Sequence, residues 1–309
     1  MLRAYNVFCK SCGPIALPSF TAFGSVPRAG GCNPKGAPVF NDFVPSDPDA
    51  VRPFVHEDGQ TVSMHFDISS IQSRMRRDDP IALDLDYTRA MMGFLMFEPE
   101  PRSILMIGLG GGSLAKYCRK HLPSADITVV ENNPHVIELR DVFFVPPDDR
   151  LFRVVCDDGA AFVAAATRRY EVVLVDGFTY DGQPESLCSE RFYADCRKAL
   201  TETGVLVVNL HAEQPACGVL RSRIAKAMNS ALSMITTEAG VNQIVFASAS
   251  AEPDQADKLR ERWAALADVH KRTLDVTSSR KAPGLRWPRL ASNASAQGPA
   301  HQPFEAAQG

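Results

Sequence analysis

A glycine-rich turn between an apolar strand and a helix is the feature that most limits what this chain can fold into. Residues 103–107, rich in branched apolar side chains, lead directly into Gly108, Gly110 and Gly112, and a helical pattern begins near Ser113. This order fits a buried parallel strand that turns abruptly into a helix. Glycines let the backbone turn in little space and approach a ligand closely, and the first N–H groups of the helix face that ligand. The stretch predicts a nucleotide-binding turn, although a tight connection without a ligand would have the same composition.

Acidic residues stand at the ends of three further predicted strands. They are Glu131 after residues 127–130, Asp158 after residues 152–155, and Asp176 after residues 172–175. A doubly wound sheet binds its ligands at the carboxyl ends of its strands, and Glu131 stands where a carboxylate can accept hydrogen bonds from ribose hydroxyls. Asp158 considered alone could equally be the N-cap of the next helix, and Asp176 could cap a turn. The three together with the glycine turn predict a nucleoside site.

The alternation of strand and helix patterns predicts an α/β fold with a mostly parallel sheet and helices on both faces. Expected strands lie near residues 103–107, 127–130, 152–155, 172–175, 205–208, 233–236 and 243–247. Before them, Asp58 and Gly59 stand between alternating apolar residues and predict a β-hairpin. The expected division is a disordered segment at 1–48, a small antiparallel β region at 49–76, a Rossmann-like domain at 77–272 and a disordered tail at 273–309. Apolar spacing predicts a helix over 85–97 and a last amphipathic helix over 259–269.

The composition excludes several classes of function. The 309 residues are 45% hydrophobic and 22% charged with a formal net charge of −3, so no basic field marks a nucleic-acid partner. No apolar run approaches the roughly 20 residues that span a bilayer, and we expect a cytoplasmic protein without a membrane partner. Cys9, Cys12 and Cys32 offer three thiols where structural zinc normally takes four ligands, so no metal is expected.

Five segments together resemble the spermidine synthase (polyamine aminopropyltransferase) family, over roughly residues 54 to 248. They are Ile-Gly-Leu-Gly-Gly-Gly-Ser-Leu at 107–114, Val-Val-Glu-Asn-Asn-Pro-His-Val-Ile-Glu at 129–138, Asp-Gly-Ala-Ala-Phe at 158–162, Val-Asp at 175–176, and Pro-Glu-Ser-Leu-Cys-Ser-Glu-Arg-Phe-Tyr at 184–193. The resemblance implies a seven-stranded, Rossmann-like S-adenosylmethionine-dependent transferase fold preceded by a small β-hairpin domain. It also implies transfer of an aminopropyl group from decarboxylated S-adenosylmethionine to a small-molecule amine.

The resemblance further implies roles for individual residues. Asp176 matches the catalytic aspartate, which would accept the proton of the attacking amine. The donor site would comprise Gly108, Gly110, Gly112, Glu131, Asp158 and Gly159, with Glu131 on the ribose hydroxyls and Asp158 on the adenine amino group. Gln72 and Tyr87 match residues that line the substrate cleft, although the spacing around Tyr87 is also that of a core residue, and Asp181 is a further candidate for binding the amine. Whether two copies of the protein form a homodimer is left open by the sequence.

The chain departs from the family's pattern at positions that recognise amines. Gly111 replaces an aspartate that holds the free amine of the decarboxylated donor, and Thr179 replaces a second aspartate three residues after the catalytic one. Thr88 stands where a glutamine follows the cleft tyrosine. Two alternatives therefore stay open: an enzyme resembling the methyltransferases that uses intact S-adenosylmethionine, and a non-catalytic nucleoside-binding protein of the same fold. Asp84, Asp86 or Asp181 could compensate for the missing carboxylates.

Overall fold

The computed structural model describes residues 51–67, 70–179, 182–230, 232–237, 240–248 and 261–274. All of them belong to one compact unit, residues 43–309. Asp181, the three N-terminal cysteines, the expected segment 1–48 and, of the expected tail 273–309, residues 275–309 lie outside the described residues. Among the described helices, none is long and apolar enough to cross a membrane.

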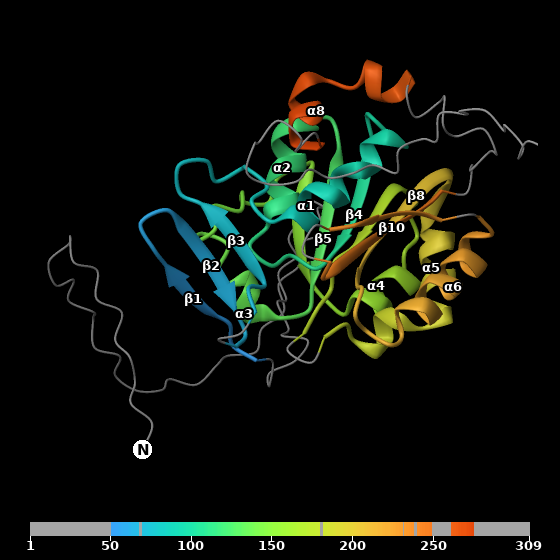
Figure 1. Ribbon diagram of the computed structural model, residues 1–309, viewed down its shortest axis with the longest axis horizontal. Coiled ribbons are helices and arrows are strands. Elements are labelled where there is room, and N and C mark those ends of the chain that lie inside the picture. The colour runs from blue at the N-terminus through green and yellow to red at the C-terminus, as the bar shows by residue number, and fades with distance from the viewer. Residues whose placement is uncertain are drawn as a thin grey trace, which may run out of the picture. The chain divides into compact units, whose positions relative to one another are not determined.

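A seven-stranded sheet forms the centre of this unit (Figure 1). Its strands are β4 (Ser103–Ile107), β5 (Asp126–Glu131), β6 (Phe152–Cys156), β7 (Tyr170–Val175), β8 (Leu200–His211), β9 (Ser233–Thr236) and β10 (Asn242–Ser248). They lie in the order β6-β5-β4-β7-β8-β10-β9. The first five are parallel, and β10 runs antiparallel to both β8 and β9. The mostly parallel, seven-stranded sheet expected from the sequence is confirmed.

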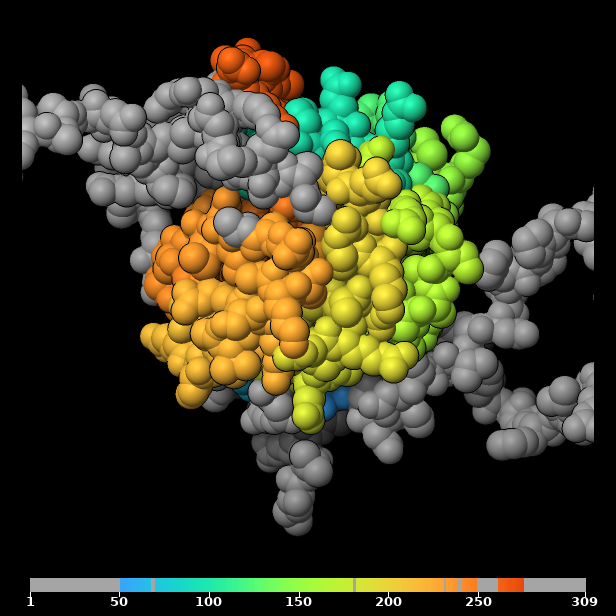
Figure 2. Space-filling model, turned by 90° about the vertical axis from the view of Figure 1, so that its right-hand side faces the viewer, coloured from blue at the N-terminus to red at the C-terminus, as the bar shows by residue number. Residues whose placement is uncertain are grey.

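Helices cover both faces of this sheet, which is why its strands read as continuous apolar runs. On one face lie α1 (Asp86–Met91), the 3₁₀ turn η1 (Met92–Met96), α2 (Ser113–His121) and α8 (Asp268–Leu274). On the other lie α4 (Gly159–Ala164), the 3₁₀ turn η2 (Glu185–Cys188), α5 (Glu190–Ala199) and α6 (Cys217–Met228). The short α3 (Pro134–Ile137) follows β5. Figure 2 shows α5 and α6, in yellow and orange, side by side on their face.

The alternation of side chains along each strand separates two hydrophobic cores. In β4, Ile104 and Met106 join the core beneath α1 and α2, whereas Leu105 and Ile107 join the core beneath α4 and α5. All four are at most 3% exposed. Side chains at the strand ends follow the same alternation, so Asp176 lies on the same face as Leu174, the face covered by α1.

The expected hairpin is part of a small three-stranded antiparallel sheet, made of β1 (Phe54–Glu57), β2 (Thr61–His65) and β3 (Ser73–Arg76). Asp58 stabilises the turn between β1 and β2, because its Oδ1 accepts a hydrogen bond from the N–H of Gln60 at 2.7 Å and its Oδ2 accepts one from the Thr61 hydroxyl at 3.0 Å. The buried side chains of Val62, Met64 and Met75 join the core beneath α1 and α2. The small sheet therefore presents its apolar face to the larger domain.

The two expected helices that flank the domain differ in detail from the prediction. The pattern over 85–97 forms α1 and then η1, whose Phe94 and Leu95 are fully buried. At the C-terminal end, residues 261–265 are helical and α8 is a separate helix. It continues to Leu274, which is fully buried, two residues beyond the expected end of the domain.

Candidate active site

A cavity of about 430 Å³ lies at the carboxyl ends of the central strands, next to the small sheet and the start of α1. Eight of the residues predicted from the sequence line it: Gln72, Tyr87, Gly108, Gly110, Glu131, Asp158, Gly159 and Asp176. Gly112 is not among its lining residues, and Asp181 is outside the described chain. Segments far apart in the sequence thus contribute to one site, as expected for the ligand-binding edge of a doubly wound sheet.

The glycine turn needs glycine for different reasons at different positions. Gly108 has a φ of +100°, and a Cβ there would lie 2.2 Å from the carbonyl oxygen of Asp176, so only glycine lets β4 and β7 end side by side at the cavity. Gly112 has a φ of +67° and precedes α2, where a Cβ would lie 2.4 Å from Val145 Cγ2. Gly112 is therefore needed for the start of α2, although it does not line the cavity.

Glu131 joins the glycine turn to the end of β5. Its Oε2 accepts a hydrogen bond from the N–H of Leu109 at 2.8 Å, and its Oε1 accepts one from the N–H of Asn133 at 2.9 Å. Burial raises the pKa of the Glu131 carboxyl, and the backbone N–H groups oppose that shift by stabilising the charged form. The carboxylate lies at the cavity and already accepts hydrogen bonds from the backbone, and its contact with hydroxyl groups of a ligand stays a prediction.

Asp158 is the N-cap of α4, the alternative that the sequence left open. Its Oδ1 accepts a hydrogen bond from the N–H of Ala161 at 2.7 Å, while the residue also lines the cavity. The next residue, Gly159, lets α4 approach the sheet closely, since a Cβ there would lie 2.5 Å from Ile107 Cγ2. Capping does not consume the second carboxylate oxygen, so contact with a ligand stays a prediction.

Asp176 lies where β7 ends, between two neutral hydrogen-bond donors. The side-chain amide of Asn209 donates to its Oδ1 at 2.8 Å, and the hydroxyl of Tyr87 also hydrogen-bonds to the carboxylate. Burial raises the pKa of Asp176 to about 6, although both hydrogen bonds act in the opposite direction. A carboxyl with a pKa in this range can exchange a proton near neutral pH. The structure brings Asp176 and Tyr87 together in the cavity.

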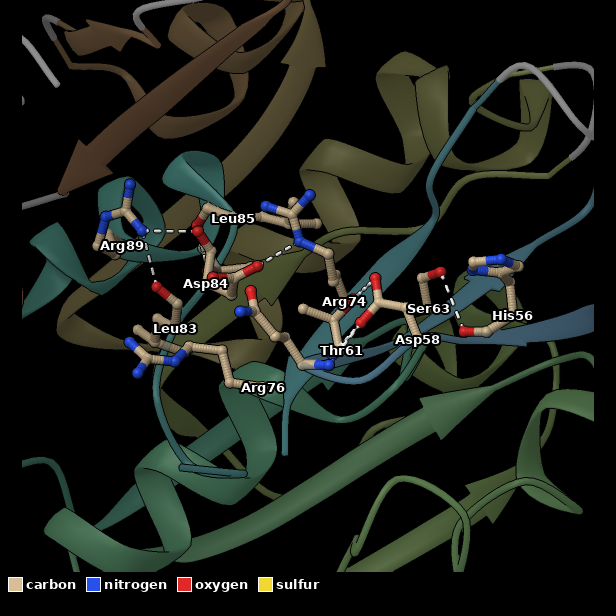
Figure 3. Close-up of polar contacts among 12 residues, drawn as sticks. His56, Asp58, Thr61, Ser63, Arg74, Arg76, Leu83, Asp84, Leu85 and Arg89 are labelled. Atoms are coloured by element: carbon tan, nitrogen blue, oxygen red, sulfur yellow. Dashed lines mark hydrogen bonds and ion pairs between the residues drawn. The ribbon is translucent and has the colours of Figure 1, made fainter. Parts of the chain in front are cut away.

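Two arginines fix the segment that carries Tyr87 (Figure 3). Arg89 donates to the carbonyl oxygens of Leu83 and Asp84, both at 2.8 Å. Arg74 of β3 forms an ion pair with the Asp84 side chain, so the small sheet is tied to the residues that precede α1. Asp84 is thus engaged by Arg74 and is not among the cavity-lining residues, whereas Asp86 is.

The replacement of the family's aspartate at Gly111 has a steric counterpart. A Cβ at Gly111 would lie 2.7 Å from Ser73 Oγ and 2.8 Å from Phe143 Cδ1. Phe143 is 1% exposed and Ser73 is 5% exposed, so both neighbours are held in place. A side chain at position 111 would require the Ser73 hydroxyl and the Phe143 ring to move.

The charges of the cavity favour a cationic ligand. Its described lining includes four carboxylates and neither lysine nor arginine; the acidic residues are Asp86, Glu131, Asp158 and Asp176. The one histidine there, His211, stacks on Phe178 with ring centroids 4.5 Å apart, and burial lowers its pKa. This histidine is therefore neutral at pH 7.

Sequence reasoning missed Asn209, Asn242 and the stacked pair Phe178–His211, all of which line the cavity. Asn209 follows the predicted strand 205–208 directly, so the strand-end argument that found Asp176 could have found it too. Asn242 stands at the start of an antiparallel strand, and no comparable signal identifies it.

Comparisons of the sequence with known proteins point to one family. Residues 85–252 match the spermine/spermidine synthase domain family. A polyamine aminopropyltransferase of Neisseria meningitidis is 33% identical over 70% of this chain and 83% of its own length. One of Chromobacterium violaceum is 42% identical over 50% of this chain, an alignment that spans 60% of that protein.

The fold has counterparts among solved structures. A probable spermidine synthase from Corynebacterium glutamicum superposes with a TM-score of 0.56 at 17% identity, covering 82% of this chain and 95% of its own. That likeness concerns the fold alone, whereas the family match and the Neisseria relative concern the sequence itself. The chain therefore belongs to the spermine/spermidine synthase family.

Proposed function

We propose that this protein transfers an aminopropyl group from decarboxylated S-adenosylmethionine to a small-molecule amine. The observation that carries the proposal is the placement of Asp176 and Tyr87 in the same acidic cavity as Glu131 and the glycine turn. The sulfonium donor and the ammonium form of the acceptor are both cations. A cavity with four carboxylates and no lysine or arginine in its described lining suits both.

The residues that would bind the donor lie at one half of the sheet, and the residue that would bind the amine lies at the other half. On the side of β4, β5 and β6, Glu131 would hold the ribose hydroxyls, Asp158 the adenine amino group, and Gly108 and Gly110 would let the backbone approach the nucleoside. On the side of β7 and β8, Asp176 would hold the amine. Gln72 and Tyr87 would line the cleft between them.

The reaction asks for positioning and for one proton transfer. The nitrogen of the acceptor attacks the methylene carbon next to the sulfonium, a C–N bond forms, and the C–S bond breaks as the thioether leaves with the electron pair. Because an ammonium nitrogen has no free electron pair, it gives one proton to Asp176 before it attacks, and the product leaves as a secondary ammonium. The sulfonium is already a good leaving group, so most of the acceleration comes from holding the two partners in line.

A second candidate, transfer from intact S-adenosylmethionine, is favoured by one observation. Gly111 stands where the family carries the aspartate for the donor's free amine, and Ser73 and Phe143 leave no room for such a side chain. Thermal shift with the two donors separates the candidates, since a ligand at 100 times its Kd stabilises by about 2.7 kcal/mol. Stabilisation by the decarboxylated donor alone supports aminopropyl transfer, and stabilisation by the intact donor alone supports the second candidate.

The activity itself is tested by transfer from labelled donor to a panel of di- and polyamines. We expect Asp176→Asn to keep donor affinity while kcat falls by about 10² to 10⁴, because the amide cannot accept the proton. Asn has nearly the same size and shape as Asp, and the neighbouring Asn209 is not changed, so we expect the cavity to keep its shape. Absence of transfer by the wild type to every amine would count against aminopropyl transfer. Equal transfer by wild type and variant would refute only the role of Asp176.

A further inference from the structure

A chain of two side-chain amides, both from residues that line the cavity, continues from Asp176. Asn209 Nδ2 donates to Asp176 Oδ1 at 2.8 Å, and Asn209 Oδ1 accepts a hydrogen bond from Asn242 Nδ2 at 3.0 Å. The second bond fixes the orientation of the first amide. With its oxygen engaged by Asn242, Asn209 can turn only its N–H toward the carboxylate.

These asparagines occupy positions where the fold would otherwise place apolar side chains. Along β8, Asn209 continues the row of Val205 and Val207 on the face covered by α1, and it is 2% exposed. On β10, Asn242 continues the row of Ile244 and Phe246 on the same face, as the antiparallel register of the two strands requires. A buried amide costs stability unless it is hydrogen-bonded, and Asn209 is engaged at both ends.

Asn242 is itself held firmly. Its backbone N–H donates to Thr237 Oγ1 at 3.1 Å, and its carbonyl oxygen accepts a hydrogen bond from the Thr237 N–H at 2.9 Å. Thr237 is 4% exposed. The amide chain therefore begins at a fixed point on β10 and ends on the carboxylate of β7.

We propose that Asn209, oriented by Asn242, is a positioning residue that keeps Asp176 ionised and aimed into the cavity as the proton acceptor. The catalytic part of this statement rests on the proposed function. The hydrogen-bonding part does not, because it concerns the ionisation of one carboxyl group. A hydrogen bond from a neutral donor stabilises the carboxylate and not the protonated acid, so it acts against the burial that favours the acid.

Other titratable groups reach the cavity around Asp176 and would respond to the same experiment. They are Asp86 and Tyr87 from α1, Glu131 from β5, Asp158 before α4 and His211 from β8, while the described residues of β4 and β10 that line it are neutral. Among the residues that the structure describes, Tyr87 alone joins Asn209 in hydrogen bonding to the carboxylate. A change confined to Asn209 should therefore act on Asp176 first.

The test measures the Asp176 titration directly, by carbon-13 NMR of the aspartate carboxyl groups, with the signal assigned through Asp176→Asn. In Asn209→Leu the Asp176 carboxylate loses one hydrogen bond. We therefore expect its titration midpoint to rise by about one pH unit, because a hydrogen bond to a charged group contributes roughly the free energy of that shift. Asn242→Leu should raise it by less, because Asn209 then keeps its place but loses its fixed orientation. Thr128→Val, a buried polar-to-apolar change on β5 outside the cavity, is the control and should leave the midpoint unchanged.

Kinetics supply the second readout. The acidic limb of the kcat/KM profile should move in Asn209→Leu by the same amount as the NMR titration, with activity recovering at high pH. An unchanged titration, or an equal loss of activity at every pH, would overturn the proposal. Should Asn209→Leu fail to fold, Asn209→Ser takes its place with the same expected direction. If the wild type transfers to no amine, the proposed function fails, whereas a shifted titration would still support the role of Asn209 toward Asp176.

Discussion

Asp176 must ionise beside two neutral donors, the hydroxyl of Tyr87 and the amide of Asn209. Burial therefore dominates, and the pKa of Asp176 lies at about 6, above the value of an unfolded aspartate. Between these two values the folded protein binds the proton more tightly than the unfolded chain, so stability falls as the pH rises through this range. Above about pH 6 the full cost of the buried charge is present.

Asp176→Asn should remove that cost. We expect the variant to be more stable than the wild type at pH 7.5, by about 1 to 3 kcal/mol, and to match it at pH 4, where the wild-type carboxyl is protonated. Urea unfolding at the two pH values measures the difference. Equal stabilities at both pH values would show that the Asp176 carboxyl is not perturbed by burial.

Glu131 combines a structural and a predicted binding role, and substitution can separate them. Glu131→Gln keeps one oxygen acceptor for the turn but loses the charge and sets an amide NH2 against the other backbone N–H, so we expect affinity for methylthioadenosine to fall at least about tenfold and the melting temperature to fall less than in Glu131→Ala. Glu131→Ala should lose both affinity and stability. Glu138→Gln, on an exposed side chain after α3, is the matched control. Calorimetry that finds unchanged affinity in Glu131→Gln would remove the residue from the ligand site.

The position of a single side chain can be predicted from the sequence where its residue directly follows a strand. Glu131, Asp158 and Asp176 were found because the carboxyl ends of parallel strands share one edge. Asn242 could not be found in this way, since it enters the cavity from the start of an antiparallel strand. Its contact with Asn209 depends on the pairing of β8 with β10, which periodicity does not predict.

Among the elements, the turn between β4 and α2 is the most constrained by its neighbours. Gly111 faces Ser73 of β3 and the buried ring of Phe143 at distances too short for a Cβ. We expect Gly111→Ala to destabilise the protein by about 1 to 3 kcal/mol through overpacking. Gly59→Ala is the control, because a Cβ there would meet nothing within 4 Å. Equal melting temperatures for the two variants would mean that the Ser73 hydroxyl and the Phe143 ring move aside at little cost.

The strands of the large sheet were predictable because their apolar runs are buried on both faces. β3 was not, although it follows the hairpin closely. It has four residues, of which Ser73 and Met75 are buried while Arg74 and Arg76 point outward. Such a short segment with one large apolar side chain gives too little periodicity, and its pairing with β2 decides its structure.

The whole molecule depends on contacts between distant parts of the chain that the sequence does not announce. The Tyr117 hydroxyl of α2 donates to Thr273 Oγ1 of α8 at 2.9 Å, and Leu274 is fully buried in the core beneath α1 and α2. Composition predicted that the ordered chain ends near residue 272, because few large apolar residues follow. A single buried leucine at the end of a helix changes the local composition too little to be predicted in this way.

These contacts decide where the chain can be shortened. We expect a chain of residues 49–276 to unfold cooperatively at nearly the wild-type temperature, since it retains every described contact of α8 and the hydrogen bond from Asn133 Nδ2 to the Val51 carbonyl oxygen.

A chain of residues 49–272 loses the burial of Leu274 and should be less stable by about 2 kcal/mol or more. For a domain of this size that lowers the melting temperature by about 4 °C or more. Leu274→Ala in the longer chain should reproduce most of the loss. Calorimetric melting of the three proteins tests this: equal temperatures for the two truncated chains would show that α8 does not stabilise the core, and non-cooperative melting of both would show that the removed segments pack on it.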